Sequence, residues 1–267
     1  MDEQESLRQL LQAVTWAKTQ WEALDQADQQ AGTPVPGSPL AGDDAKSDPY
    51  QVSHYAYHAL MAGLDHMHCL HSSLIDAQEN TLRFHLHSQF SLIRGGIENA
   101  ARAVWVIAPN GRTERIKRRL KLQNKEYISS AGLRKACGVP EVEVDQWLKE
   151  RKDKVVSVAI AAGVLSTSAV KALSPPNYKT IAAEAGEAVG LGDANAEAVW
   201  RMCSGLAHGD MSGTVSTLEL ERVGGTPGVD ITRVTVNVEN LLMCTQAACM
   251  MLKQGIDLYN RRAQAAF

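Results

Sequence analysis

One stretch of the chain, residues 193 to 210, carries side chains suited to chemistry on a phosphate ester. It contains Glu197, Arg201, Ser204 and His208 in a segment with helical character. At about 100° per residue, positions seven apart fall within roughly 20° of each other, so Arg201 and His208 share one face of a helix. An imidazole can move protons near neutral pH, and a guanidinium can hold two phosphate oxygens at once. The segment therefore presents a proton-transfer group beside a phosphate clamp.

Start and stop signals support a helix over these residues. A Gly-Leu-Gly break precedes Asp193, which is a residue type that caps helix N-termini, and Gly209 is the usual residue just after a helix end. The opposite face of the helix is an apolar stripe formed by Val199, Cys203 and Leu206. The helix is expected to pack through this stripe and to leave the Arg–His face open.

The same residues also fit a purely structural interpretation. Glu197 and Arg201 are one turn apart, a spacing at which an ion pair stabilises an exposed helix. A histidine directly before a glycine is also a common helix ending, because its ring can hydrogen bond the last free carbonyls. A site for RNA or a nucleotide and a plain surface helix both remain open from the sequence.

An earlier helix, predicted over 81–108, places charges beside its core stripe. Arg94 and Glu98 lie one turn apart, next to the apolar residues, where charges are normally paired or functional. Gly95 and Gly96 favour a close helix approach or a kink at this point. Glu98 is therefore a candidate accessory catalytic residue and Arg94 a candidate RNA-binding residue. An ion pair that only ties two helices together is the alternative.

Residues 112 to 125 predict a strongly basic helix. Such a helix can follow the phosphates of an RNA strand, since phosphate charge dominates the affinity of nucleic-acid binding. We expect three of its side chains to contact RNA: Arg115, Arg118 and Arg119. No aromatic residues are interleaved, so stacking on bases is not indicated. A solvated basic face is the alternative explanation.

The pattern of Arg201, six residues and His208 resembles the signature of the HEPN superfamily, helical bundles in which an Arg-x4–6-His segment lies on a late helix. The likeness consists of this motif and the helix count over about residues 50 to 262. Many members are metal-independent ribonucleases of toxin–antitoxin and anti-phage systems, and others only bind nucleic acid or nucleotides. Met202 departs from the pattern, because the position after the arginine is often polar in active members, and this bears on activity more than on fold.

The resemblance implies roles for individual residues. His208 would be the general acid or base and Arg201 the phosphate clamp, with Ser204 and Glu98 as accessory groups. The products of cleavage would be a 2′,3′-cyclic phosphate and a 5′-hydroxyl. The resemblance also implies a homodimer in which two copies of the motif face each other.

The whole chain predicts a mainly α protein, a helical bundle with one C-terminal β-hairpin and an N-terminal helix on a flexible linker. Residues 1–31 read as an amphipathic helix, and 32–49, rich in Pro, Gly and Asp, as the linker. Residues 50–267 would be the helical-bundle domain. Two alternating stretches within it, 215–223 and 229–238, are joined by Gly-Gly-Thr-Pro-Gly and predict the hairpin.

Composition restricts the classes of function. A net charge of −3 excludes a globally basic nucleic-acid binder, although it allows a local basic site. The five cysteines form no CxxC pair, no apolar stretch approaches the roughly 20 residues of a membrane span, and the N-terminus has no signal core. We therefore expect a soluble cytoplasmic protein that has free thiols and makes no membrane contact.

No cofactor and no metal ion is predicted. The nucleotide-binding patterns GxGxxG and GxxxxGK[ST] are absent, as is the hydrolase pattern GxSxG. Two histidine pairs, His54 with His58 and His68 with His71, have spacings at which a metal could be shared. Few carboxylates or thiols accompany them at ligand spacing.

A non-enzymatic interaction protein is the alternative function. In that case the N-terminal helix, on its tether, would dock a protein partner or a second subunit. Arg201 and His208 would then be ordinary surface residues.

Overall fold

The structure is a computed structural model that describes residues 2–25, 32–76, 78–166 and 170–265. The described part is mainly α, as predicted. Its helices are α1 (Glu3–Asp25), α2 (Pro39–Ser47), α3 (Val52–Leu74), α4 (Ser88–Ile107), α5 (Arg112–Ala136), α6 (Glu141–Ala161), α7 (Tyr178–Ala188), α8 (Asp193–His208), α9 (Met211–Thr217) and α10 (Val238–Ala263), with a 3-10 turn at Val170–Leu173. Its strands form two antiparallel pairs, β1 (Ile75–Asp76) with β2 (Thr81–Leu82) and β3 (Glu219–Thr226) with β4 (Val229–Thr235).

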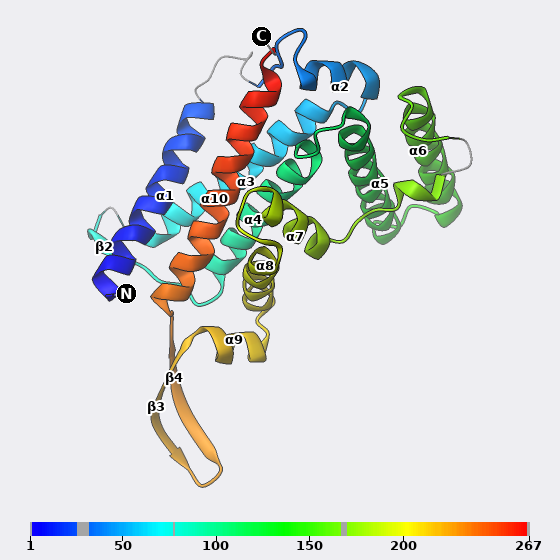
Figure 1. Cartoon of the computed structure of the whole chain (residues 1–267). Helices are drawn as coiled ribbons and strands as arrows, with labels where there is room; N and C mark the ends of the chain where they lie inside the picture. Colours follow the sequence, from blue (N-terminus) through cyan, green and yellow to red (C-terminus); the bar gives the residue numbers. More distant parts are fainter. Residues whose placement is uncertain (1, 26–31, 77, 167–169, 266–267) are drawn as a thin grey trace.

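Four long helices, α1, α3, α4 and α10, form the central bundle (Figure 1). Helix α4 is its central element, since it packs on α3 and α10 and is covered on another side by α7 and α8. Apolar residues recur along α4 at helical spacing and are fully buried, among them Phe90, Ile93 and Val104. Each such side chain stabilises the fold by about 1.5–3 kcal/mol relative to its exposed state. The helix that carries Arg94 and Glu98 is therefore firmly anchored.

The glycine pair in α4 permits the close helix approach that was predicted. A methyl group on Gly95 would collide with the ring of His66, and one on Gly96 would lie 2.8 Å from the sulfur of Met67. Both neighbours belong to α3, where Gly63 faces the carbonyl oxygen of Gly96. Because Gly63, Gly95 and Gly96 have no side chain, the backbones of α3 and α4 can approach closely at this point.

The N-terminal helix is an integral part of the bundle. Leu10, Val14 and Ala17 of α1 are buried in the same core as α3 and α10. The apolar stripe that a free docking helix would need is thus already covered. The predicted division into a separate helix at 1–31 and a bundle domain at 50–267 is wrong, because both parts share one core.

The prediction of a flexible linker over 32–49 is wrong for its second half, which forms α2. The Ser38 hydroxyl accepts a hydrogen bond from the backbone N–H of Ala41 and so caps this helix. Leu40 and Asp43 are completely buried on its inner side. The helix has only 9 residues, too few for an apolar periodicity to show in the sequence. Part of the predicted N-terminal segment, residues 26–31, lies outside the described residues.

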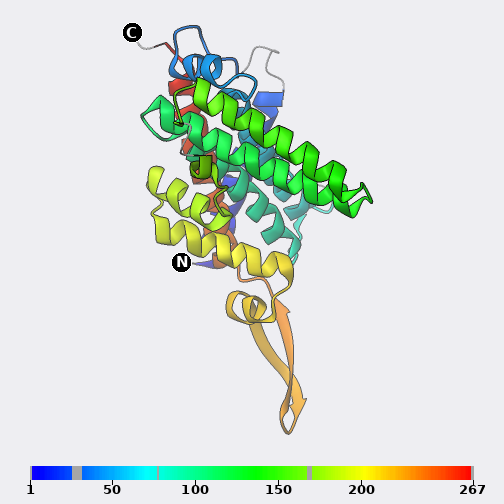
Figure 2. The same ribbon diagram turned by 90° about the vertical axis from the view of Figure 1, so that its right-hand side faces the viewer.

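The C-terminal hairpin is confirmed with shifted boundaries. Its first strand begins at Glu219 because the preceding residues form α9, and Thr217 and Leu218 are buried where the chain leaves that helix. The pairing of β3 with β4 has an irregularity between Arg222 and Gly224. Figures 1 and 2 show this ribbon extending away from the helices, and nearly all of its side chains are exposed.

The basic segment is longer than predicted. It belongs to a single helix, α5, that continues to Ala136 and packs on α6. The two helices stand as a pair at one side of the bundle (Figure 1). None of the helices in the described ranges is long and apolar enough to cross a membrane.

Candidate site between helices α4 and α8

Helix α8 has the ends that its sequence predicted, with one shift. Gly192, with φ of +84°, is the N-cap, and Asp193 is the first helical residue. At the other end Gly209 adopts the left-handed conformation, with φ of +69°, which glycine tolerates without strain. Its backbone N–H donates to the carbonyl of Leu206. The apolar stripe of α8 faces the core as expected: Val199, Cys203 and Leu206 are buried.

The central feature of the site is a contact between α4 and α8. Arg94 Nη1 donates to His208 Nε2 at 3.0 Å, across 114 residues of sequence. A guanidinium has donors only, so the imidazole nitrogen must accept here. A neutral His208 ring therefore carries its proton on Nδ1. The structure thus brings together the predicted candidates Arg94 and His208.

Glu98 holds the arginine in place. Its Oε1 accepts from Arg94 Nε at 2.9 Å and from the indole N–H of Trp200, also at 2.9 Å. Arg94 also lies over the Trp200 ring, 6.0 Å from its centroid. The side chains of Arg94 and Glu98 are 24% and 19% exposed, so the ion pair is shielded but reachable. The pair ties α4 to α8, because Arg94 donates to His208 and Glu98 accepts from Trp200.

Sequence reasoning missed two residues of this site. Trp200 could have been found, because Trp200, Ser204 and His208 repeat every four residues and so lie along one side of α8. His87 carried no such signal. Its Nδ1 donates to the carbonyl of Leu206 at 3.0 Å and holds the last turn of α8 against the start of α4. Only the folded chain places that carbonyl, 119 residues away, within reach.

Arg201 lies at the open edge of the site. Its side chain is 58% exposed, and its Nε donates to Glu197 at 2.7 Å. The guanidinium lowers the pKa of Glu197, and Lys179 of α7, 3.7 Å from the same carboxylate, acts in the same direction. Within the described parts of the chain, Arg201 forms no bond to His208, and the half-buried Ser204 forms no hydrogen bond. Arg201 and His208 therefore lie on one helix face but do not bond to each other.

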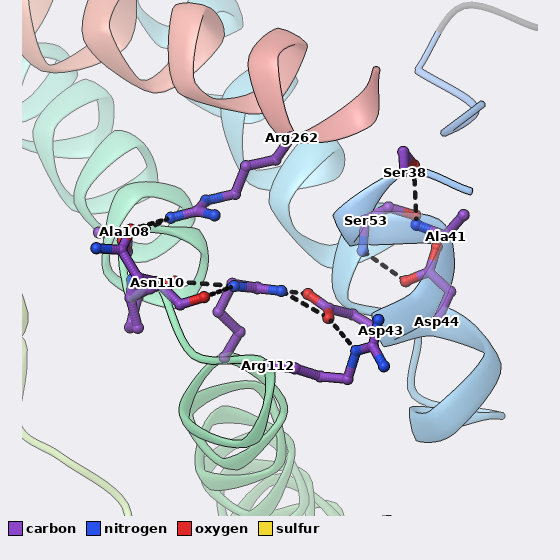
Figure 3. Close-up of polar contacts among 11 residues, drawn as sticks. Ser38, Ala41, Asp43, Asp44, Ser53, Ala108, Asn110, Arg112 and Arg262 are labelled. Carbon is purple, nitrogen blue, oxygen red and sulfur yellow. Dashed lines mark hydrogen bonds and ion pairs between the residues drawn. The ribbon is translucent and has the colours of Figure 1, made fainter. Parts of the chain in front are cut away.

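The three arginines of α5 do not form an RNA-binding face. Arg115 and Arg119 are only 3% and 7% exposed, so the prediction that they contact RNA is wrong for this fold. Arg115 donates through Nε and Nη2 to the carboxylate of Asp43, at 2.5 and 2.8 Å, and the exposed Arg112 pairs with the same carboxylate at 3.3 Å (Figure 3). The Arg119 guanidinium lies 4.4 Å from the centroid of the Tyr55 ring.

The third of these arginines is also occupied. Arg118 donates to the carbonyl of Trp105 at 2.9 Å and pairs with Glu114 and Glu184 at 3.1 and 3.2 Å. It keeps 20% of its side chain exposed. In this helix Arg115, Arg118 and Arg119 are therefore engaged mainly by protein groups. Its chief acidic partner, Asp43, comes from the segment that was predicted to be a linker.

Met202 faces away from the polar site, into an apolar groove. The groove lies between α8 and α10, has a volume of about 460 Å³ and is rich in methionine. Its wall on α8 is formed by Asn195, Ala198, Val199 and Met202, and its wall on α10 by Met243, Gln246, Ala247 and Met250. Both sets follow the i, i+3, i+4, i+7 spacing of a helix–helix interface. The departure from the family pattern at Met202 thus contributes to this groove.

The histidine-rich part of α3 does not assemble a metal site in the described residues. Within residues 2–25, 32–76, 78–166 and 170–265, no group of three or more His, Cys, Asp or Glu side chains is placed to hold a metal ion. His68 instead stacks on Trp21, with ring centroids 4.3 Å apart.

No protein-family model, curated protein or solved structure matches this chain. The site is therefore interpreted from its geometry and chemistry.

Proposed function

We propose that this chain binds RNA at the α4–α8 site and cleaves it without a metal ion, in the manner that its resemblance to HEPN domains implies. The observation that carries the proposal is the contact between Arg94 and His208. It joins a cation that can hold phosphate with an imidazole that can move a proton. The two groups come from different helices and meet at a partly exposed position, where a substrate could reach both.

The bonding suggests how the site would act. An entering phosphate would take the Nη1 donor of Arg94 away from His208, which frees Nε2 to accept the proton of a 2′-hydroxyl. The 2′-oxygen would then attack phosphorus, and the bond from phosphorus to the 5′-oxygen would break. The imidazolium would return its proton to the 5′-oxygen. The products would be a 2′,3′-cyclic phosphate and a 5′-hydroxyl.

Arg201 and Glu98 would assist His208 in different ways. The exposed Arg201 would stabilise the charge that develops on the phosphate oxygens. Glu98 would keep the Arg94 guanidinium oriented, supported by Trp200. Ser204, on the same side of α8, would be an accessory hydrogen-bonding group.

We also propose that the chain acts as a homodimer through the methionine-rich groove between α8 and α10. On the helical wheel the α8 wall of this groove lies about 100° beyond Arg201. A second copy seated there would bring its own Arg201 and His208 to the neighbouring edge. Methionine side chains adapt well to such packing, and Met243 is 42% exposed in the single chain.

The proposed function is tested by incubating purified protein with total cellular RNA in EDTA. We expect the wild type to cut RNA and His208→Ala to lose cleavage by a factor of about 10² to 10⁴. His58→Ala, at an exposed histidine of α3, is the matched control and should cut normally. Equal cleavage by wild type and His208→Ala would refute the catalytic role. Absence of cleavage by any of the three would leave RNA binding, measured by gel shift with the same variants.

A further inference from the structure

A second cleft opens farther along α4, beside the charged row that begins at Arg94. It has a volume of about 280 Å³ and is enclosed by α3, α4, α5 and α7. Its polar lining contains two cations, one carboxylate, two tyrosines and two serines: Arg102, Lys125, Glu126, Tyr55, Tyr178, Ser129 and Ser130. Arg94, Glu98 and Arg102 follow one another every four residues along α4. Arg102 therefore lies about 12 Å along the helix from Arg94.

One of the two cations that line this cleft, Arg102, has a donor without a partner. The Nε of Arg102 is buried and finds no hydrogen-bond partner among the residues that the structure describes. Its Nη2 is held by the side-chain oxygen of Asn99. Arg119, which lies behind the Tyr55 ring, likewise has a buried Nη1 that is unpaired within the described ranges. Buried guanidinium N–H groups normally have acceptors, so their presence here indicates that an acceptor is missing.

Lys125 is the second cation of the cleft. Its Nζ donates to the carbonyl of Pro176 at 2.8 Å and lies 3.7 Å from the centroid of the Tyr178 ring. Burial lowers the pKa of Lys125, and the neighbouring Arg102 lowers it further, while Glu98 acts in the opposite direction. No ion pair of Arg102 or Lys125 with a carboxylate occurs in the described part of the chain. Two positive groups thus share a partly shielded space that one carboxylate, Glu126, also lines.

We propose that this cleft binds a phosphate group, held by Arg102 and Lys125. An anion between them would give the unpaired Arg102 Nε an acceptor and would offset the repulsion between the two cations. The exposed hydroxyls of Ser129 and Ser130 add donors at the rim. This site is distinct from the Arg94–His208 contact, and phosphate binding in it does not require that the chain cleave RNA.

The size and the remaining charge of the cleft narrow the ligand to a nucleoside monophosphate. Its volume lies just below the roughly 300–1,000 Å³ of typical small-molecule sites, which suits a single nucleotide unit. Glu126 is the one carboxylate of the lining. It only accepts hydrogen bonds when ionised, and so favours a ligand with hydroxyl or amino groups next to its phosphate. The phosphate could be that of a free nucleotide or the end of an RNA strand.

Calorimetric titration of the full chain tests this site. The probes are adenosine 5′-monophosphate, adenosine, inorganic phosphate and a short single-stranded RNA. We expect the monophosphate to bind at least tenfold more tightly than adenosine, and both Arg102→Gln and Lys125→Gln to weaken it at least tenfold. Lys121→Gln, on the same helix but outside the cleft, is the control and should bind like the wild type.

The outcomes distinguish a free nucleotide from an RNA phosphate as the ligand, and they show whether binding in this cleft depends on RNA cleavage. Binding of RNA alone, lost in Arg102→Gln and Lys125→Gln, would support the site with an RNA phosphate as its ligand. His208→Ala should still bind the monophosphate, which keeps this result independent of cleavage. Equal affinity for adenosine and its monophosphate, no binding of any of the four probes, or unchanged affinity in both glutamine variants would overturn the proposal. A thermal shift by the monophosphate in the wild type but not in a folded Lys125→Gln protein is the second measurement.

Discussion

Two arginine–carboxylate pairs lie near opposite ends of α4, and they differ in what surrounds them. Arg115 and Asp43, beyond the C-terminal end, are 3% and 0% exposed, and Arg115 also donates to the carbonyls of Pro109 and Asn110. Arg94 and Glu98, in the first half of α4, are 24% and 19% exposed. The additional partner of Arg94 is an imidazole nitrogen rather than a backbone carbonyl.

This difference in exposure and in bonding partners indicates which pair can bind a ligand. A pair enclosed by protein, with its donors engaged by backbone and carboxylate oxygens, joins helices and cannot change partners without partial unfolding. A half-exposed pair that directs one donor at a histidine ring can exchange that partner for phosphate. Basic residues in a sequence therefore do not identify a nucleic-acid site until their partners are known.

The largest effect is expected at the buried pair. Asp43→Ala leaves Arg115 as an uncompensated buried charge, and we expect it to lower the free energy of unfolding by about 3–5 kcal/mol. Urea unfolding followed by circular dichroism measures the loss. Glu221→Ala removes an exposed carboxylate that pairs with Arg233 on the hairpin and should cost at most about 1 kcal/mol. A loss below about 1 kcal/mol in Asp43→Ala would show that the buried Arg115–Asp43 pair contributes no more to stability than the exposed Arg233–Glu221 pair.

A smaller effect is expected at the half-exposed pair. Glu98→Gln removes the charge that faces Arg94 but keeps an oxygen for the indole N–H of Trp200. We expect it to lower the free energy of unfolding by about 1 kcal/mol, within the range of hydrogen bonds in partly exposed places. The rate of RNA cleavage should fall by more than this loss of stability can explain, because Arg94 loses its orientation. The control is Glu197→Gln at the exposed partner of Arg201, and equal losses of cleavage in the two variants would contradict a special role for Glu98.

The smallest effect on stability is expected at His208. The residue is exposed, so His208→Ala should change the free energy of unfolding by about 0.5 kcal/mol or less. Its melting temperature, measured by circular dichroism, should match that of His58→Ala. A loss above about 2 kcal/mol would mean that the Arg94–His208 contact is a structural tie, like the one between Arg115 and Asp43.

Local patterns in the sequence predicted much of the fold. The 3.6-residue repeat of apolar residues predicted the mainly α bundle, and alternation around a glycine-rich turn predicted the hairpin. The ends of α8 followed from glycines that tolerate a left-handed backbone, and the pair Gly95–Gly96 predicted a close helix contact or a kink. Each of these features depends on residues that are near one another in the chain.

The main errors involve partners that are distant in the chain. Helix α2 was predicted to be a linker from its Pro, Gly and Asp content. Its 9 residues carry no periodic pattern, and the burial of Leu40 and Asp43 against other helices is not visible in the local sequence. The arginines of α5 were predicted to contact RNA because basic residues are dense in that segment. The prediction missed their carboxylate, carbonyl and aromatic partners, which come mainly from other elements. His87 was missed because the carbonyl that it binds belongs to α8.

The sequence by itself determined most of the long helices, the hairpin and the placement of Arg201 and His208 on one face of α8, since helical geometry relates positions a few residues apart. Tertiary structure alone decided that Arg94, which Glu98 holds in place, contacts His208 and that Arg115 does not face solvent. It also decided that Arg102 and Lys125 share a cleft. The reason is physical: a charged side chain acts through the groups around it, and packing of distant segments determines those groups.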